Sequence, residues 1–348
     1  MSFEGRRDRY LDLDVLRALA VILVMFEHYS GIPEYFPIGA GDIGVGLFFV
    51  LSGYLITSIL ISDLDKEQKA ALVLKGFYVR RFFRLFPIYY ILLTILIFLE
   101  LGNVKQDWAW HFSYLSNVNM ALGGETNVFW TLAVEEQFYL VWPIILVLIP
   151  VGYRLHSAVF LIIFTLFFKL VCLYLGVFPD FRLLPSQFTR LGAGALLAIW
   201  VYRDGCAFKT NCISPAQMAF LQAAAVTGLI GASTIWYFDE DPYLRLLFND
   251  FLCVPAFVYI IICATNGIRS KYLRLLFDNE FLIYLGSISY GIYLVHNWVP
   301  KYIDTYIGLT DFPKLVLTLF LTIGICAFSW KYIEYRCIQF GRRISYST

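Results

Sequence analysis

The chain has 348 residues, of which 59% are hydrophobic and only 15% are charged, and its mean hydropathy is +0.69. These values lie far outside the composition of soluble globular domains and exclude an ordinary soluble fold. The formal net charge of +1 gives no indication of a nucleic-acid partner.

Apolar runs of the length that a bilayer core requires, about 20 residues, recur along the whole chain. We expect ten transmembrane helices, at residues 13–31, 43–62, 84–101, 131–150, 157–176, 185–202, 214–236, 246–265, 281–300 and 314–333. The first run follows three arginines but has no small-residue cleavage site, so we expect it to remain as a span. The predicted fold class is an all-α polytopic membrane protein of the cell membrane.

The first predicted span, DVLRALAVILVMFEHYSG, carries Asp14, Arg17 and His28. Eleven residues separate Arg17 from His28, which corresponds to about 1100° of helical rotation and roughly 16 Å of rise, so both side chains lie on one face. A charge at the centre of a span costs about 2.5–3.5 kcal/mol, and such residues commonly mark functional sites. We therefore expect this polar stripe to line a functional cavity.

The second span contains small residues, and three arginines lie at the mouth of the third span. Gly46 and the Ser52-Gly53 pair allow close helix packing. The stretch FYVRRFFRLFP contains Arg80, Arg81 and Arg84, for which two interpretations stay open. The arginines are a juxtamembrane stop signal that contacts lipid phosphates, or they bind the pyrophosphate of a nucleotide-bearing cofactor.

Further polar residues lie in the later spans. Glu135 and Glu136 stand side by side near the start of the fourth span, after a connection at 102–130 in which we expect a short helix. Adjacent helix positions point about 100° apart, so one carboxylate can face a polar cavity while the other reaches the interface. We interpret Lys169 as a snorkelling residue. The remaining polar candidates are Arg190, His296 and Glu334.

The distribution of basic residues predicts the topology. The predicted segments on the side of the N-terminus hold most lysines and arginines. Those on the other side hold only Lys105, Arg182, Arg245, Lys301 and Lys314. By the positive-inside rule both termini lie in the cytoplasm. The seven cysteines show no CxxC or CxxH spacing, so we expect no metal site.

In their order along the chain, these motifs closely resemble acyltransferase family 3, the membrane acyltransferases of bacterial surface and extracellular glycans. The resemblance is carried by Asp14 with Leu16-Arg17, the Arg-x10-His pair, GLFFVLSGYLI, RRFFRLFP, WTLAVEEQFYLVWP, Arg190 with its glycines, SISYGIYLVH and Glu334. It covers about residues 10–343, which we expect to form one membrane domain without an appended soluble domain. The chain departs from the family pattern at Val15 and after Glu334.

The resemblance implies transfer of an acyl group, usually acetyl, from cytoplasmic acyl-coenzyme A to a sugar hydroxyl on an extracytoplasmic or lipid-linked glycan. It implies no tightly bound cofactor. Arg17, Arg80, Arg81 and Arg84 would hold the phosphates of coenzyme A. His28 would act as general base or acyl carrier, with Glu27, Glu135 or Glu136 orienting its ring; of these we favour Glu136.

The remaining polar residues, Asp14, Glu135, Arg190, His296 and Glu334, would bind the acceptor or support the structure. The acceptor and the oligomeric state, including a homo-oligomer, stay open. The main competing interpretation is a proton-coupled transporter of a sugar or small anion, which also places Arg, Glu and His within spans.

Overall fold

The computed structural model describes residues 4–30, 39–66, 69–125, 127–176, 180–203, 214–238, 242–266 and 275–346. All regular secondary structure in these ranges is helical. Among the described residues, seven helices are long and apolar enough to cross a membrane: Ala40–Lys66, Ala70–Phe98, Phe129–Leu148, Val151–Tyr174, Pro215–Ile235, Leu247–Thr265 and Phe312–Ser345. They coincide with seven of the ten predicted spans and confirm a multi-pass membrane protein.

The other three predicted spans, 13–31, 185–202 and 281–300, are helical but are not among these seven. The first two correspond to α1 (Glu4–Ser30) and α8 (Leu184–Arg203). The range 281–300 is divided among α12 (Glu280–Ser287), α13 (Ser289–Val295) and the beginning of α14 (Trp298–Tyr306). The expectation of one continuous helix at 281–300 is therefore wrong, because the helix is interrupted at Ile288 and again at His296 and Asn297.

The chain divides into two compact units. The first unit comprises residues 1–61 and 145–287, and the second comprises 62–144 and 288–348. Two long helices, α2 (Ala40–Lys66) and α6 (Phe129–Leu148), have residues in both units.

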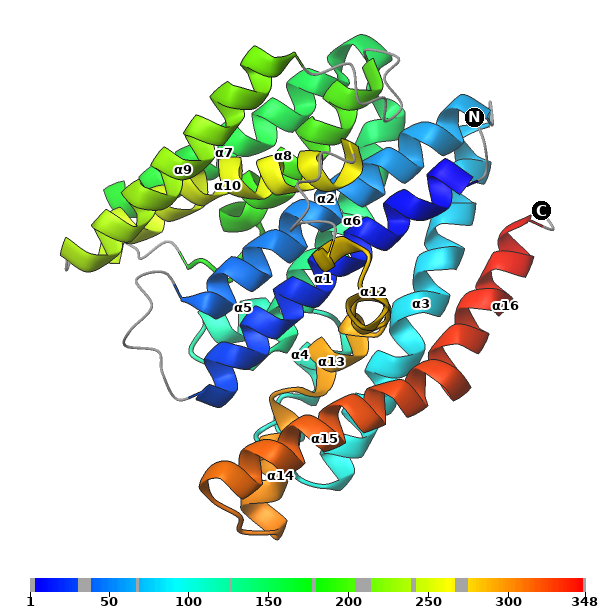
Figure 1. The fold of residues 1–348 in the computed structure, drawn as a ribbon, viewed down its shortest axis with the longest axis vertical. Coiled ribbons are helices and arrows are strands. Elements are labelled where there is room, and N and C mark those ends of the chain that lie inside the picture. Colours follow the sequence, from blue (N-terminus) through cyan, green and yellow to red (C-terminus); the bar gives the residue numbers. More distant parts are fainter. Residues whose placement is uncertain are drawn as a thin grey trace. The chain divides into compact units, whose positions relative to one another are not determined.

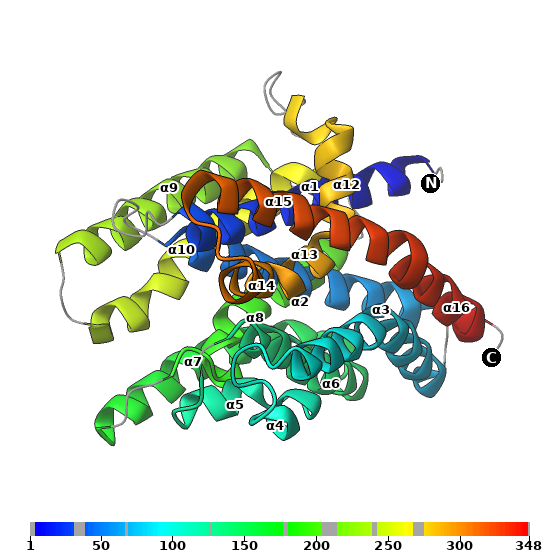
Figure 2. The same cartoon turned by 90° about the horizontal axis from the view of Figure 1, so that it is seen from below.

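In the first unit, α1 packs along α12, α7 (Arg154–Tyr174) along α8, and α9 (Pro215–Phe238) along α10 (Pro242–Asn266). Figures 1 and 2 show α9 and α10 side by side. The core is built from apolar residues of α1, α2, α8 and α10, including Leu16, Val50, Leu197 and Ile261.

Glycines bring α2 and α8 into near contact. A Cβ atom built on Gly53 would lie 2.0 Å from the carbonyl oxygen of Leu191, and one on Gly194 would lie 2.0 Å from that of Val50. Only residues without a side chain allow backbones to approach so closely. The packing interpretation of the Ser52-Gly53 pair is therefore confirmed.

In the second unit, α3 (Ala70–Phe98) packs against α16 (Tyr335–Tyr346), as Figure 1 shows. A short π-helix, η3 (Trp330–Glu334), connects α15 (Asp311–Ser329) to α16. Since α3 begins at Ala70, Arg80, Arg81 and Arg84 lie within the helix, whereas the sequence placed them at the mouth of a span beginning at 84. The boundary was misplaced because the arginines interrupt the apolar run without interrupting the helix.

The connection at 102–130 contains two short helices, α4 (Trp108–Phe112) and α5 (Ser116–Ala121), which confirms the helix expected there. His111 is buried in this connection, with its Nδ1 atom 2.8 Å from the Ser116 hydroxyl. Tyr89 of α3 donates a hydrogen bond to the His111 carbonyl oxygen at 2.9 Å. Burial lowers the pKa of His111 below its usual 6.5, although the charges of Asp107 and Glu125 act in the opposite direction.

This lowered pKa predicts a loss of stability in mild acid. The unfolded chain takes up the proton first as the pH falls below about 6.5, so the stability due to neutral His111 is present above that pH and declines below it. We expect the thermal midpoint in detergent to fall between about pH 7.5 and about pH 5.5, and to fall less in His111→Asn. His156→Asn, at an exposed histidine of α7, is the control. An equal pH effect in all three proteins would contradict this assignment.

Candidate active site

His28 lies in the last turn of α1 and is exposed. Its Nδ1 atom is 2.8 Å from the carbonyl oxygen of Val24. A carbonyl oxygen can only accept a hydrogen bond, so Nδ1 carries the hydrogen, and Nε2 of the neutral ring keeps its lone pair. The local helix geometry thus fixes the tautomer that a general base requires.

Arg17 lies on the same helix as His28 and forms an ion pair with Asp14, one turn earlier. Both side chains are half-buried. Helix α12 covers this turn closely, since a Cβ atom on Gly286 would lie 1.8 Å from the Asp14 carbonyl oxygen. The structure therefore confirms that Asp14 and Arg17 lie on one helix face, and it gives Arg17 an anionic partner within the chain.

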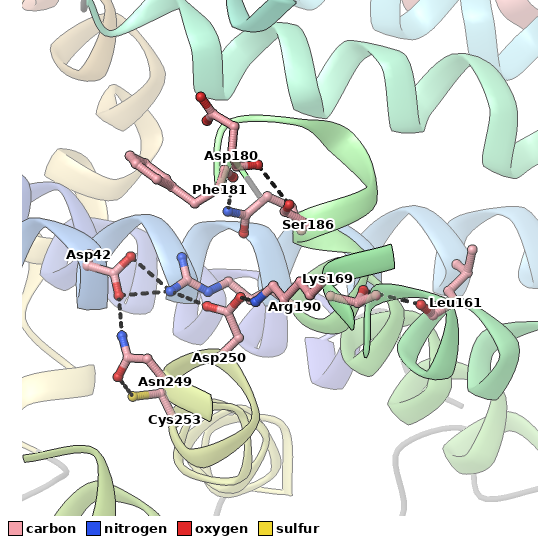
Figure 3. Close-up of polar contacts among 12 residues, drawn as sticks. Asp42, Leu161, Lys169, Asp180, Phe181, Ser186, Arg190, Asn249, Asp250 and Cys253 are labelled. Atoms are coloured by element: carbon pink, nitrogen blue, oxygen red, sulfur yellow. Dashed lines mark hydrogen bonds and ion pairs between the residues drawn. The ribbon is translucent and has the colours of Figure 1, made fainter. Parts of the chain in front are cut away.

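Arg190 is the centre of a buried ion-pair network in the first unit (Figure 3). Its Nη2 atom lies 2.8 Å from Asp42 and 2.7 Å from Asp250. Lys169 donates a hydrogen bond to Asp250 at 2.9 Å, and Asn249 donates one to Asp42 at 3.1 Å. The side chains of Lys169, Arg190 and Asp250 are buried, whereas that of Asp42 is 40% exposed. The two cations are balanced by two anions, which makes the burial of the inner three charges tolerable within apolar helices.

This network corrects the interpretation of Lys169. The Lys169 side chain is fully buried and paired with Asp250, so it does not snorkel. Its position within the predicted span 157–176 suggested that its ammonium group reaches the interface, but that group binds the Asp250 carboxylate of α10 instead. Asp250 was not singled out from the sequence, although a lone aspartate inside the apolar run 246–265 was a usable signal.

In the second unit, neighbouring arginines of α3 have different partners. Arg80 donates hydrogen bonds to Asp63 at 2.7 Å and to the Ser345 hydroxyl at 2.9 Å. The guanidinium carbon of Arg81 instead lies 3.9 Å from the ring centroid of Tyr139. Arg81 is also close enough to Glu135 and Glu136 for its charge to act on both carboxylates. Arg80 therefore links α3 to Asp63 of α2 and to Ser345 of α16. Arg81 instead lies next to polar side chains of α6.

Two carboxylates and Tyr290 converge near these arginines. The charges of Glu136 and Glu334 both act on Tyr290 of α13, whose hydroxyl donates a hydrogen bond to the Leu85 carbonyl oxygen at 3.3 Å. Glu334 is buried, accepts a hydrogen bond from Ser329 at 2.9 Å, and is acted on by the charge of Arg84. Glu334 ends the π-helix, a local geometry that is frequent at functional sites.

His296 is fully buried, and its Nδ1 atom donates a hydrogen bond to the Tyr293 carbonyl oxygen at 2.7 Å. It therefore differs from the exposed His28 and resembles a packing residue.

The structure thus brings predicted site residues together in three groups, two in the first unit and one in the second. Asp14 pairs with Arg17 on the helix of His28, and Arg190 forms its own network. Arg81, Arg84, Glu135, Glu136 and Glu334 gather around α3, α6 and η3. Tyr290 was missed because the motif SISYGIYLVH drew attention to its histidine.

Comparison with known proteins identifies the family. The profile of the Acyltransferase domain family (Acyl_transf_3) matches residues 10–333. The chain belongs to acyltransferase family 3. No solved structure matches this acyltransferase-3 chain.

Several curated proteins are similar to this family member. The peptidoglycan O-acetyltransferase OatA of Listeria monocytogenes is 30% identical over 92% of this chain and 54% of its own length. The O-acetyltransferase OatA of Staphylococcus aureus strain NCTC 8325 is 27% identical over 94% of this chain and 57% of its own. A putative O-acetyltransferase of S. aureus strain COL shows the same identity and coverage. The chain spans about half the length of the relatives it matches.

Proposed function

We propose that this protein is an O-acyltransferase that moves an acetyl group from cytoplasmic acetyl-CoA to a sugar hydroxyl of an extracytoplasmic or lipid-linked glycan. The observation that carries the proposal is the fixed tautomer of exposed His28, in a chain whose curated relatives from Listeria monocytogenes and Staphylococcus aureus are named O-acetyltransferases. The name of the Listeria relative makes a glycan of the cell envelope a reasonable acceptor class.

In this proposal, Nε2 of His28 removes the proton of the acceptor hydroxyl as the oxygen attacks the thioester carbonyl. The new ester bond forms, the carbon–sulfur bond breaks, and coenzyme A leaves as its thiolate. The proton that Nε2 has taken from the acceptor passes to this thiolate, so that His28 returns to its neutral form. A route through an acyl-histidine would divide the same bond changes into two steps. Glu136 as the partner of His28 stays a prediction.

The phosphates of the donor are assigned to Arg17, Arg80, Arg81 and Arg84. Arg81 is the strongest candidate among them, because its partners include an aromatic ring rather than only carboxylates, and because guanidinium groups bind phosphates well. To contact a phosphate, Arg17 would have to give up its ion pair with Asp14. Arg80 would likewise have to give up its ion pair with Asp63.

Arg81→Ala is expected to weaken acetyl-CoA binding. A charge-assisted hydrogen bond contributes about 1.5–3 kcal/mol, which corresponds to about 10- to 150-fold in Kd. Binding of acetyl-CoA to purified protein in detergent measures this. Lys75→Ala, at an exposed position of the same helix, is the control. If Arg81→Ala binds acetyl-CoA like the parent protein, the donor site is misplaced.

We propose ten spans, counting the interrupted helical stretch at 281–300 as one, with both termini in the cytoplasm. The distribution of basic residues supports this topology. A reporter that is active only in the cytoplasm should work when fused after Arg343 and should fail within 102–130. The reverse pattern would contradict this topology.

Purified protein in proteoliposomes tests the function against the transporter alternative. We expect label from acetyl-labelled acetyl-CoA to appear in added peptidoglycan fragments or lipid-linked oligosaccharides, with release of free coenzyme A. Movement of sugar across the bilayer without release of coenzyme A would contradict the proposal and favour a transporter.

A further inference from the structure

The beginning of α2 is held against the end of α1 by Glu27. The carboxylate oxygen Oε2 of Glu27 accepts a hydrogen bond from the backbone N–H of Gly41 at 2.7 Å. Glu27 is half-buried and directly precedes His28. Backbone N–H groups in the first turn of a helix have no partner within the helix, and the positive end of the helix dipole favours a carboxylate there.

Two glycines make this contact possible. A Cβ atom on Gly39 would lie 2.8 Å from Oε2 of Glu27, and one on Gly41 would lie 2.7 Å from Oε1. Both distances are shorter than real Cβ atoms show. The sequence Gly39-Ala40-Gly41 thus leaves space for the carboxylate on both sides of the first residue of α2.

The same turn of α2 is fixed from other helices of the first unit. Asp42, next to Gly41, accepts hydrogen bonds from Arg190 of α8 at 2.8 Å and from Asn249 of α10 at 3.1 Å. Figure 3 shows these contacts converging on Asp42. The first turn of α2 is therefore held in place by α8 and α10. Glu27 connects the last turn of α1 to this turn.

We infer that Glu27 is a positioning residue for His28: its carboxylate ties the histidine-bearing turn of α1 to the start of α2. This inference rests on the proposed function. Adjacent residues of a helix point about 100° apart, so Glu27 acts through the backbone and not by contact with the imidazole. The role requires a hydrogen-bond acceptor and does not require a negative charge or a proton.

The kinetic test compares Glu27→Ala, Glu27→Gln and Gly41→Ala. Misplacing a catalytic group by about 1 Å can cost about 100-fold in rate. We expect kcat to fall by about 10- to 100-fold in Glu27→Ala and in Gly41→Ala, with KM for acetyl-CoA unchanged. Glu27→Gln keeps an acceptor oxygen and should retain most activity. The double variant Glu27→Ala/Gly41→Ala should be no worse than either single variant, because both remove one contact.

Gly324→Ala, in α15, is the matched control, since nothing lies within 4 Å of a Cβ atom built there. Loss of activity in Glu27→Gln would overturn the inference, because it would indicate that charge or proton transfer matters. Additive losses in the double variant would also overturn it.

A second measurement separates this inference from the proposed function. The rate at which diethyl pyrocarbonate modifies His28, followed by mass spectrometry with exposed His156 as internal reference, needs no acyl transfer. We expect this rate to change in Glu27→Ala and Gly41→Ala and to stay at the parent value in Glu27→Gln and Gly324→Ala. An unchanged rate in all four variants would overturn the inference that the contact between Glu27 and Gly41 positions His28. An inactive parent protein with the expected pattern of rates would refute the proposed function alone.

Discussion

Replacing His28 with Gln is expected to abolish acyl transfer while leaving acetyl-CoA binding and membrane insertion intact. Gln can still donate a hydrogen bond to the Val24 carbonyl oxygen that now accepts one from Nδ1, but it cannot take up the proton of the acceptor. Loss of a positioned general base lowers the rate by about 10²–10⁴-fold. Transfer of labelled acetyl groups and binding of acetyl-CoA, measured on the same preparation, give the two quantities.

The matched control for this change is His156→Gln, at the exposed histidine of α7, which should transfer like the parent protein. Retention of most activity in His28→Gln would show that His28 serves hydrogen bonding or packing, and the base would have to be Glu136 or His296.

The second large effect concerns the charge balance around Arg190. Asp250→Asn leaves Lys169 and Arg190 with Asp42 as the remaining carboxylate of the network. Removing one partner of a buried ion pair costs about 3–5 kcal/mol, because it leaves an uncompensated charge. We expect a clear fall in the thermal midpoint of the detergent-solubilised protein.

Lys169→Met in the same chain removes the extra positive charge and should restore most of the lost stability. Non-additivity of this kind is the sign of direct coupling between two residues. If the double variant Lys169→Met/Asp250→Asn is destabilised by the sum of the two single changes, the buried pair does not stabilise the first unit.

Much of the fold followed from apolar runs alone, since a bilayer requires about 20 consecutive apolar residues per helix. The exceptions have physical reasons. Arg80 and Arg81 interrupted the hydropathy of α3 but not its hydrogen bonding, so the helix begins earlier, at Ala70. The break at Ile288 is flanked by Ser287 and Ser289. Hydropathy averaged over about 20 residues does not resolve so short a stretch of small polar residues.

Most charged candidates could be singled out from the sequence, although Asp250 and Tyr290 were missed, but the contacts of these residues could not be predicted. A charge inside a span is visible in the sequence, and this is how Arg17, His28, Glu136 and Arg190 were found. Which carboxylate neutralises which cation depends on packing between distant helices, as in the pair of Lys169 and Asp250. The contact of Glu27 with Gly41 was equally hidden, because its partner is a backbone N–H group.

The most direct test of the proposed function is transfer across a sealed bilayer. Protein is reconstituted in one orientation, acetyl-labelled acetyl-CoA is supplied on the side of the basic loops, and peptidoglycan fragments or lipid-linked oligosaccharides are supplied on the opposite side. We predict that the parent protein labels the glycan across the bilayer and that His28→Ala does not. Labelling only when donor and acceptor share one side, or equal labelling by His28→Ala, would contradict the proposed function.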